Sequence, residues 1–244
     1  MFQSFLLGFS TALTNDQIQV ILQLTSVFEN STTDLQFGYA ENIKDGRGIT
    51  FGFVGFCTGT GDGLQVLSEY SRIQKGSDLE ALKYLAVLEK IEAQGKEMNS
   101  SVKGLDGFIN YINRIGNGDA FIQASLTIAN KLYVMPSQKK ASELGLKLPI
   151  SLGQLYDSYL NHGEDGTLSI IKKSGSVDGN ERVWLQRFLE NRLELLKKDK
   201  TWKESVDRIT VYQQLLKSNQ MLFTPISFTC YGDHFKLEIR TEEL

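Results

Sequence analysis

Residues 29–62 differ from the rest of the chain because they combine carboxylates, glycines and aromatic residues between two stretches of helical periodicity. Residues 49–56 are aromatic and β-branched with two glycines, a composition typical of a short strand or a bent ribbon whose backbone approaches another group closely. Most of the remaining sequence repeats apolar residues at three- and four-residue steps, as amphipathic helices do. Because only three prolines interrupt the 244 residues, the pattern predicts an α+β protein that is predominantly helical and carries a small sheet.

Several helix boundaries can be placed from capping signals. Thr14 and Gln17 have the spacing of a capping box, and the helix that they begin places Glu29 at its C-terminal end. Asp62 is the expected cap of the next helix, and a second capping box opens a helix at Ser77. Further helices are predicted at residues 108–115, 120–134 (ended by Pro136), 151–161, 181–197 and 202–217, and a hairpin at 226–239.

Composition excludes several classes of function. The chain is 41% apolar and 23% charged, which is typical of a globular protein. Its net charge of −3 lacks the basic excess that nucleic-acid binding needs and suits a neutral or cationic ligand. No apolar run approaches the ~20 residues of a membrane helix. We therefore expect no nucleic-acid or membrane partner and, since two histidines and two cysteines are too few for a thiolate zinc site, no metal or cofactor. A monomer is the expected oligomeric form.

The first twelve residues include a short apolar run, but no Lys or Arg precedes Lys44. A secretory signal needs a positively charged start, so we expect a signal peptide to be absent or degenerate in this chain. Cys57 and Cys230 are too few for a disulfide framework, and the sequence leaves open whether they are paired or free.

Acid–base hydrolysis needs one group that donates a proton and another that activates water, so carboxylates around a glycine-rich turn are a candidate site. Glu29 follows an apolar helix face, which suits a proton donor, and Asp45 precedes Gly-Arg-Gly, where a neighbouring cation suits an ionised base. A glutamate at a helix end and an Asp-Gly pair are each more often structural. Three other carboxylates of the segment are equally eligible, namely Asp34, Glu41 and Asp62.

The segment contains three motifs in order: Glu29-Asn-Ser31, Tyr39-Ala-Glu-Asn-Ile-Lys-Asp-Gly-Arg-Gly-Ile-Thr50, and Gly55-Phe-Cys-Thr-Gly-Thr-Gly-Asp62. Together they resemble the signature of glycoside hydrolase family 46, the chitosanases, and shorter matches follow in family order to residues 231–233. The resemblance implies a lysozyme-like fold of two mostly helical lobes with a small sheet and a substrate cleft between the lobes. It implies one catalytic domain over 1–244, with a lobe boundary near 94–104 and the C-terminal helices returning to the first lobe.

The resemblance also implies an activity. Members of the family are secreted enzymes that hydrolyse β-1,4 linkages inside chitosan chains with inversion at the anomeric carbon. Chitosan and glucosamine oligomers are therefore the expected partners, and secretion is the expected location.

The resemblance further ranks the candidate residues. It implies that Glu29 is the general acid, that Asp45 is the general base, that Thr50 helps to hold the attacking water and that Glu41 has a supporting role. It assigns Asp62 to an amino group of the substrate. Other implied sugar contacts are Ser31, Tyr39, Arg47, Gly55 and His162. An ion network behind the acid is implied at Asp157, Arg192 and Arg208, although the sequence around Arg208 departs from the family pattern.

Two alternatives stay open. A lysozyme-like hydrolase of peptidoglycan or partly acetylated chitin would share the fold and the paired carboxylates, but its substrates carry acetamide groups that offer Asp62 no ammonium partner. A catalytically inactive carbohydrate-binding relative is the other alternative. The joint presence of Glu29, Asp45 and Thr50 favours an enzyme over that binding protein.

Overall fold

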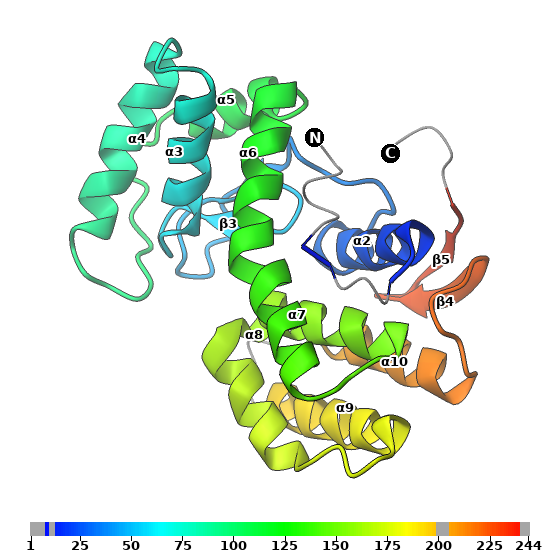
Figure 1. Cartoon of the computed structure of the whole chain (residues 1–244). Coiled ribbons are helices and arrows are strands. Elements are labelled where there is room, and N and C mark those ends of the chain that lie inside the picture. Colours follow the sequence, from blue (N-terminus) through cyan, green and yellow to red (C-terminus); the bar gives the residue numbers. More distant parts are fainter. Residues whose placement is uncertain (1–7, 10–12, 199–204, 240–244) are drawn as a thin grey trace. The chain divides into compact units, whose positions relative to one another are not determined.

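The structure is a computed structural model that describes residues 8–9, 13–198 and 205–239. Contacts divide the chain into two compact units, and each is described by itself. One unit is Leu35–Asn130, and the other comprises the described residues of Gln3–Asp34 and Lys131–Leu244. Helices dominate both units, and each contains a small antiparallel sheet, as the sequence pattern predicts (Figure 1).

The unit Leu35–Asn130 contains a sheet of three two-residue strands in the order β1 (Ala40–Glu41), β2 (Thr50–Phe51) and β3 (Phe56–Cys57). Its helices are α3 (Asp62–Ile73), α4 (Leu79–Glu92), α5 (Phe108–Ile115) and α6 (Asp119–Ala129). Helix α3 packs against both α4 and α6 (Figure 1). The core is largely aromatic, and Phe51 of β2 meets Phe108 of α5 edge to face at 5.4 Å between ring centroids.

Residues 49–56, predicted as a short strand or a bent ribbon, lie in the hairpin of β2 and β3, so the bent-ribbon alternative is confirmed. Gly52 and Gly55 have φ angles of 76° and 71° in the turn between β2 and β3, a region that only glycine enters at little cost. The register then pairs Phe51 with Phe56, and both rings are buried. Thr50 pairs with Cys57 on the opposite face of the hairpin.

The expected lobe boundary near 94–104 falls inside the unit Leu35–Asn130. The loop after α4 is held there because the Asn99 amide donates to the Gly59 carbonyl at 2.9 Å. The packing is tight, since a Cβ at Gly59 would lie 1.9 Å from the Asn99 carbonyl oxygen. The division between the two units instead falls between residues 34 and 35 and between residues 130 and 131. That the two units form one catalytic domain stays a prediction.

The other unit joins the N-terminal helix to the C-terminal helices. The central helix α8 (Pro149–Ser174) packs against α2 (Asn15–Asn30), α7 (Met135–Glu143), α9 (Glu181–Lys198) and α10 (Val206–Lys217). Strands β4 (Ile226–Cys230) and β5 (Asp233–Leu237) form the predicted hairpin, and β4 packs on α10. The predicted capping box starts α2, with Thr14 and Gln17 bonded reciprocally at 3.2 and 3.0 Å. Residues 202–204 of the predicted 202–217 helix lie outside the described residues.

Four predicted boundaries are wrong. The helix predicted at 151–161 is part of the longer α8, which ends at Ser174. Pro136 does not end a helix, because the π-helix η1 (Asn130–Val134) follows α6 and places this proline in the first turn of α7, where its missing N–H is not needed. Asp78 rather than Ser77 caps α4. Asp62 is the first residue of α3, with Gly61 as its N-cap. Within the described residues, every helix is too short or too polar to cross a membrane.

Candidate active site

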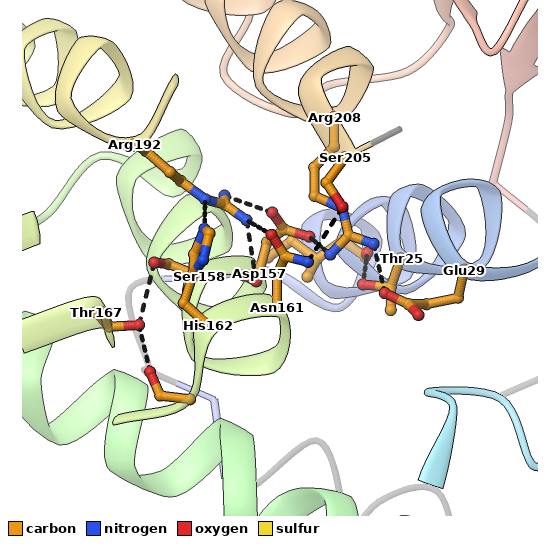
Figure 2. Close-up of polar contacts among 12 residues, drawn as sticks. Thr25, Glu29, Asp157, Ser158, Asn161, His162, Thr167, Arg192, Ser205 and Arg208 are labelled. Carbon is orange, nitrogen blue, oxygen red and sulfur yellow. Dashed lines mark hydrogen bonds and ion pairs between the residues drawn. The ribbon is translucent and has the colours of Figure 1, made fainter. Parts of the chain in front are cut away.

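The predicted acid, Glu29, lies in the last turn of α2, and its side chain is 23% exposed. Its Oε1 accepts a hydrogen bond from Nη2 of Arg208 on α10 (Figure 2). The Arg208 side chain is 3% exposed, and its guanidinium group lies 5.2 Å from the centroid of the Phe28 ring. The end of the helix therefore holds a partly exposed carboxylate against a buried cation.

Behind this ion pair, Asp157 on α8 joins two arginines. Its Oδ1 lies 3.3 Å from Nη1 of Arg208, and its Oδ2 accepts from Nη1 of Arg192 on α9 at 2.6 Å (Figure 2). The side chains of Asp157 and Arg192 are 1% and 0% exposed. Positive and negative groups therefore alternate from Glu29 to Arg192, which is how buried charges are tolerated. The structure thus brings the three residues of the predicted network together with the acid.

His162 extends this network, because its Nε2 accepts from Nε of Arg192 at 2.9 Å (Figure 2). Burial and the positive charges of Arg192 and Arg208 lower the pKa of His162 to about 2, so the ring is neutral and carries its proton on Nδ1. No local pattern marks this contact, since it depends on how α8 packs against α9. Helix α8 is interrupted immediately afterwards at Gly163, where φ is 67° and ψ is −176°.

The predicted base, Asp45, lies in a glycine-rich turn that folds Arg47 back onto it. The Arg47 amide donates to Oδ1 at 3.1 Å and its Nε donates to Oδ2 at 2.7 Å. Gly46 and Gly48 on either side of Arg47 have φ angles of 93° and 83°, which let the turn close. The side chains of Asp45 and Arg47 are 20% and 32% exposed, so solvent reaches the Asp45 carboxylate. Arg47 thus fixes the orientation of the Asp45 carboxylate.

Thr50 lies next to this turn on β2, and its side chain faces the sulfur of Cys57 on β3. Thr50 is 7% exposed, and its Oγ1 is 3.5 Å from the Cys57 Sγ. The thiol of Cys57 donates to the Gly55 carbonyl at 3.3 Å. Both cysteines of the chain are free thiols, which answers the question that the sequence left open. Burial raises the pKa of Cys57 to about 11 and that of Cys230 to about 12.

Asp62 is held by donors from its own loop. Its Oδ1 accepts from the Thr60 hydroxyl at 2.7 Å, the Gly63 amide at 2.9 Å and the Cys57 amide at 3.1 Å. Burial raises the pKa of Asp62, and these hydrogen bonds oppose the shift. The carboxylate therefore stabilises the β3–α3 turn, a role that the amino-group assignment does not include.

Tyr39 and Glu41 form an exposed pair beside β1. The Tyr39 hydroxyl donates to Oε2 of Glu41 at 3.0 Å, and partial burial together with this bond raises the pKa of Tyr39 to about 12. The register of β1 and β2 places Glu41 opposite Thr50, so both side chains lie on one face of the sheet. This neighbour relation is the supporting feature that the structure gives Glu41.

The structure groups the predicted site residues into two sets. The unit Leu35–Asn130 holds Tyr39, Glu41, Asp45, Arg47, Thr50, Gly55 and Asp62, and the other unit holds Glu29, Ser31, Asp157, His162, Arg192 and Arg208. Each predicted catalytic carboxylate has an arginine partner within its own unit. Residues 8–9, 13–198 and 205–239 contain no group of three or more His, Cys, Asp or Glu side chains arranged to hold a metal ion.

Comparisons with known proteins agree with the motifs. Residues 23–226 match the model of glycosyl hydrolase family 46. A chitosanase of Bacillus subtilis (strain 168) is 33% identical over 228 residues, which cover 86% of this chain and 80% of that protein. A chitosanase of Streptomyces sp. (strain N174) is 29% identical, covering 89% of this chain and 80% of that protein.

Solved structures of chitosanases have the same fold. The complex of the Gynuella sunshinyii GH46 chitosanase with chitotetraose has a TM-score of 0.86 at 36% identity and covers 93% of this chain and 100% of its own. A mutant chitosanase from Bacillus subtilis MY002 complexed with 6 GlcN has a TM-score of 0.85 at 31% identity, with the same coverage. The chain is therefore a member of glycosyl hydrolase family 46.

Proposed function

We propose that this protein is an endo-acting chitosanase that hydrolyses β-1,4 linkages between glucosamine units with inversion at the anomeric carbon. The observation that carries the proposal is that Glu29 and Asp45, in a chain of this family, are both partly exposed carboxylates held by an arginine. The arrangement around each carboxylate suits a different step of hydrolysis.

Glu29 acts as the general acid. Its carboxyl proton passes to the glycosidic oxygen while the bond from that oxygen to the anomeric carbon breaks, and the bonding electrons stay with the oxygen. The Glu29 carboxylate that results is stabilised by Arg208, so the cation favours the product of proton transfer. Asp157 shares the same guanidinium group, with its Oδ1 3.3 Å from Nη1 of Arg208.

Asp45 acts as the general base. A water molecule attacks the anomeric carbon on the face opposite the leaving group, and one of its protons passes to the Asp45 carboxylate. The donors of Arg47 keep that carboxylate oriented. Thr50 Oγ1 accepts a hydrogen bond from the other O–H of the water, which keeps that proton, so that a lone pair of the water points at the carbon. The proton held by Asp45 then returns to solvent, and Glu29 takes one from solvent.

The proposed substrate is a polycation, which suits an acidic chain with a net charge of −3. Asp62 binds an ammonium group of a glucosamine unit, because an ammonium partner favours the ionised carboxylate that burial disfavours. Sugar contacts are proposed for Ser31, Tyr39, Arg47, Gly55 and His162. The protein is proposed to be a secreted monomer with one catalytic domain.

The test is release of reducing ends from fully deacetylated chitosan, chitin and peptidoglycan side by side. Activity is expected on chitosan, and activity on peptidoglycan alone would favour the lysozyme-like alternative. Proton NMR of fresh product is expected to show the α anomer first, because inversion at a β linkage gives α. Initial β product would exclude a single displacement.

Two substitutions test the assigned roles. Glu29→Gln and Asp45→Asn are each expected to lower kcat by about 100-fold or more, since each removes a proton-transfer group. Glu89→Gln and Asp106→Asn are matched controls at exposed positions and are expected to leave kcat unchanged. Near-normal turnover in either site variant contradicts the assignment of that residue.

A further inference from the structure

Three side chains form a row across the sheet of the unit Leu35–Asn130. The register places Glu41 opposite Thr50 and Thr50 opposite Cys57, and directly opposite residues project from one face. The Thr58 amide donates to the Ile49 carbonyl at 3.0 Å, which marks that neighbouring pair as hydrogen-bonded. Hydrogen-bonded and non-hydrogen-bonded pairs alternate, so Thr50 and Cys57 form the narrow pair in which side chains come closest.

The direction of the Thr50 hydroxyl proton matters for the attacking water. This hydroxyl has one proton to donate and two lone pairs that accept. A water that gives one proton to Asp45 can donate a hydrogen bond through its other O–H, and Thr50 Oγ1 can accept that bond only when its own proton points elsewhere. The Cys57 sulfur lies 3.5 Å from Oγ1.

The Cys57 thiol is arranged to accept a hydrogen bond from the Thr50 hydroxyl. Its own hydrogen is directed to the Gly55 carbonyl at 3.3 Å, so the sulfur lone pairs are left for Thr50. The β2–β3 turn fixes this carbonyl, because the Gly55 amide donates to the Gly52 carbonyl at 3.2 Å and Gly55 has a φ of 71°. The thiol is 1% exposed, and burial together with the charge of Asp62 raises its pKa to about 11. The thiol therefore stays protonated and donates its hydrogen bond to the Gly55 carbonyl.

We propose that Cys57 is a positioning residue whose sulfur accepts a hydrogen bond from the Thr50 hydroxyl and thereby turns the Thr50 oxygen lone pairs toward the hydrolytic water. The inference rests on the proposed function, since it concerns the water that Asp45 activates. Cys57, which is 1% exposed, acts through Thr50.

A double-mutant cycle on the full chain tests the proposal, with chitosan hydrolysis and thermal unfolding measured for each variant. Cys57→Ala is expected to lower kcat about tenfold, equivalent to one oriented hydrogen bond, with KM unchanged within about twofold. In Cys57→Ser the serine side chain has nearly the volume of alanine but restores an acceptor for the Thr50 hydroxyl, so this variant is expected to recover kcat. In a Thr50→Val background, Cys57→Ala is expected to have no further effect on kcat, because no hydroxyl remains to be oriented.

Cys230→Ala is the matched control, since it also removes a buried free thiol, and wild-type kcat is expected for it. Three results would each overturn the proposal: wild-type kcat in Cys57→Ala, failure of Ser to rescue, or an equal loss from Cys57→Ala in both backgrounds. If Cys57→Ala does not fold, Cys57→Val fills the site without an acceptor and replaces it in the cycle. A slow Thr50→Val with a normal Cys57→Ala refutes only the role of Cys57, whereas a wild-type chain inactive on chitosan refutes the proposed function as well.

Discussion

The strongest test of the buried network is Asp157→Asn, which changes charge with almost no change of shape. Asp157 is the carboxylate between Arg192 and Arg208, whose side chains are 0% and 3% exposed. After the substitution the partly exposed Glu29 is the remaining carboxylate of this network. Removing one partner of a buried ion pair costs about 3–5 kcal/mol. We expect a value of about 3 kcal/mol, because the Asn oxygen still accepts one hydrogen bond and Arg208 keeps Glu29.

The measurement is the free energy of unfolding in urea together with the melting temperature. A loss of about 3 kcal/mol corresponds to a melting temperature lower by about 6–12 °C in a chain of this size. Glu29→Gln is the matched control, because its carboxylate is 23% exposed and Arg208 retains Asp157. We expect that variant to lose about 1 kcal/mol or less while losing activity. The reasoning is refuted if Asp157→Asn costs less than about 1 kcal/mol or no more than Glu29→Gln.

Three further predictions concern stability. The folded chain keeps His162 neutral because the pKa of His162 is about 2, whereas in the unfolded chain this side chain takes up a proton below its ordinary pKa of 6.5. His162→Gln should therefore reduce the fall in unfolding free energy between about pH 6 and 4 by up to about 1.4 kcal/mol per pH unit. An unchanged dependence of the unfolding free energy on pH contradicts this. Gly59→Ala would place its Cβ 1.9 Å from the Asn99 carbonyl oxygen, whereas at Gly38 the nearest atom is 3.6 Å away. Urea unfolding should show a loss of about 3 kcal/mol or more for Gly59→Ala and little for Gly38→Ala, and equal losses would show that the loop shifts freely. Thr14→Ala removes the hydroxyl of the capping box and should cost about 1 kcal/mol in the same assay, so an unchanged midpoint would mean that this cap is not needed.

Helix starts could be predicted from the sequence where the capping bonds are local. The Thr14–Gln17 box spans three residues, and the structure confirms it. The same reasoning misplaces the start of α4 by one residue, because the Asp78 carboxylate accepts from both the Glu80 and Ala81 amides at 3.0 Å. A charged carboxylate is favoured over a hydroxyl at this end, where the helix dipole is positive.

Helix ends that depend on packing could not be predicted in this way. Pro136 reads as a stop signal because it lacks an N–H group. In the structure the π-helix η1 precedes Pro136, so the proline occupies the first turn of a new helix. Nothing in the local sequence distinguishes these two outcomes, since the same residue is suited to both positions.

The site shows the same division between local and distant contacts. Asp45 and Arg47 are two residues apart, and their ion pair follows from the turn that separates them. Arg208 lies 179 residues from Glu29 and His162 lies 30 residues from Arg192, so these pairings depend on which helices pack together. The resemblance places Asp157, Arg192 and Arg208 behind Glu29, but it assigns neither the atoms that pair nor the contact of His162 with Arg192, because both depend on helix packing. Asp157→Asn therefore tests how this packing holds Arg208 against Glu29, whereas Glu29→Gln tests the proposed proton donor itself.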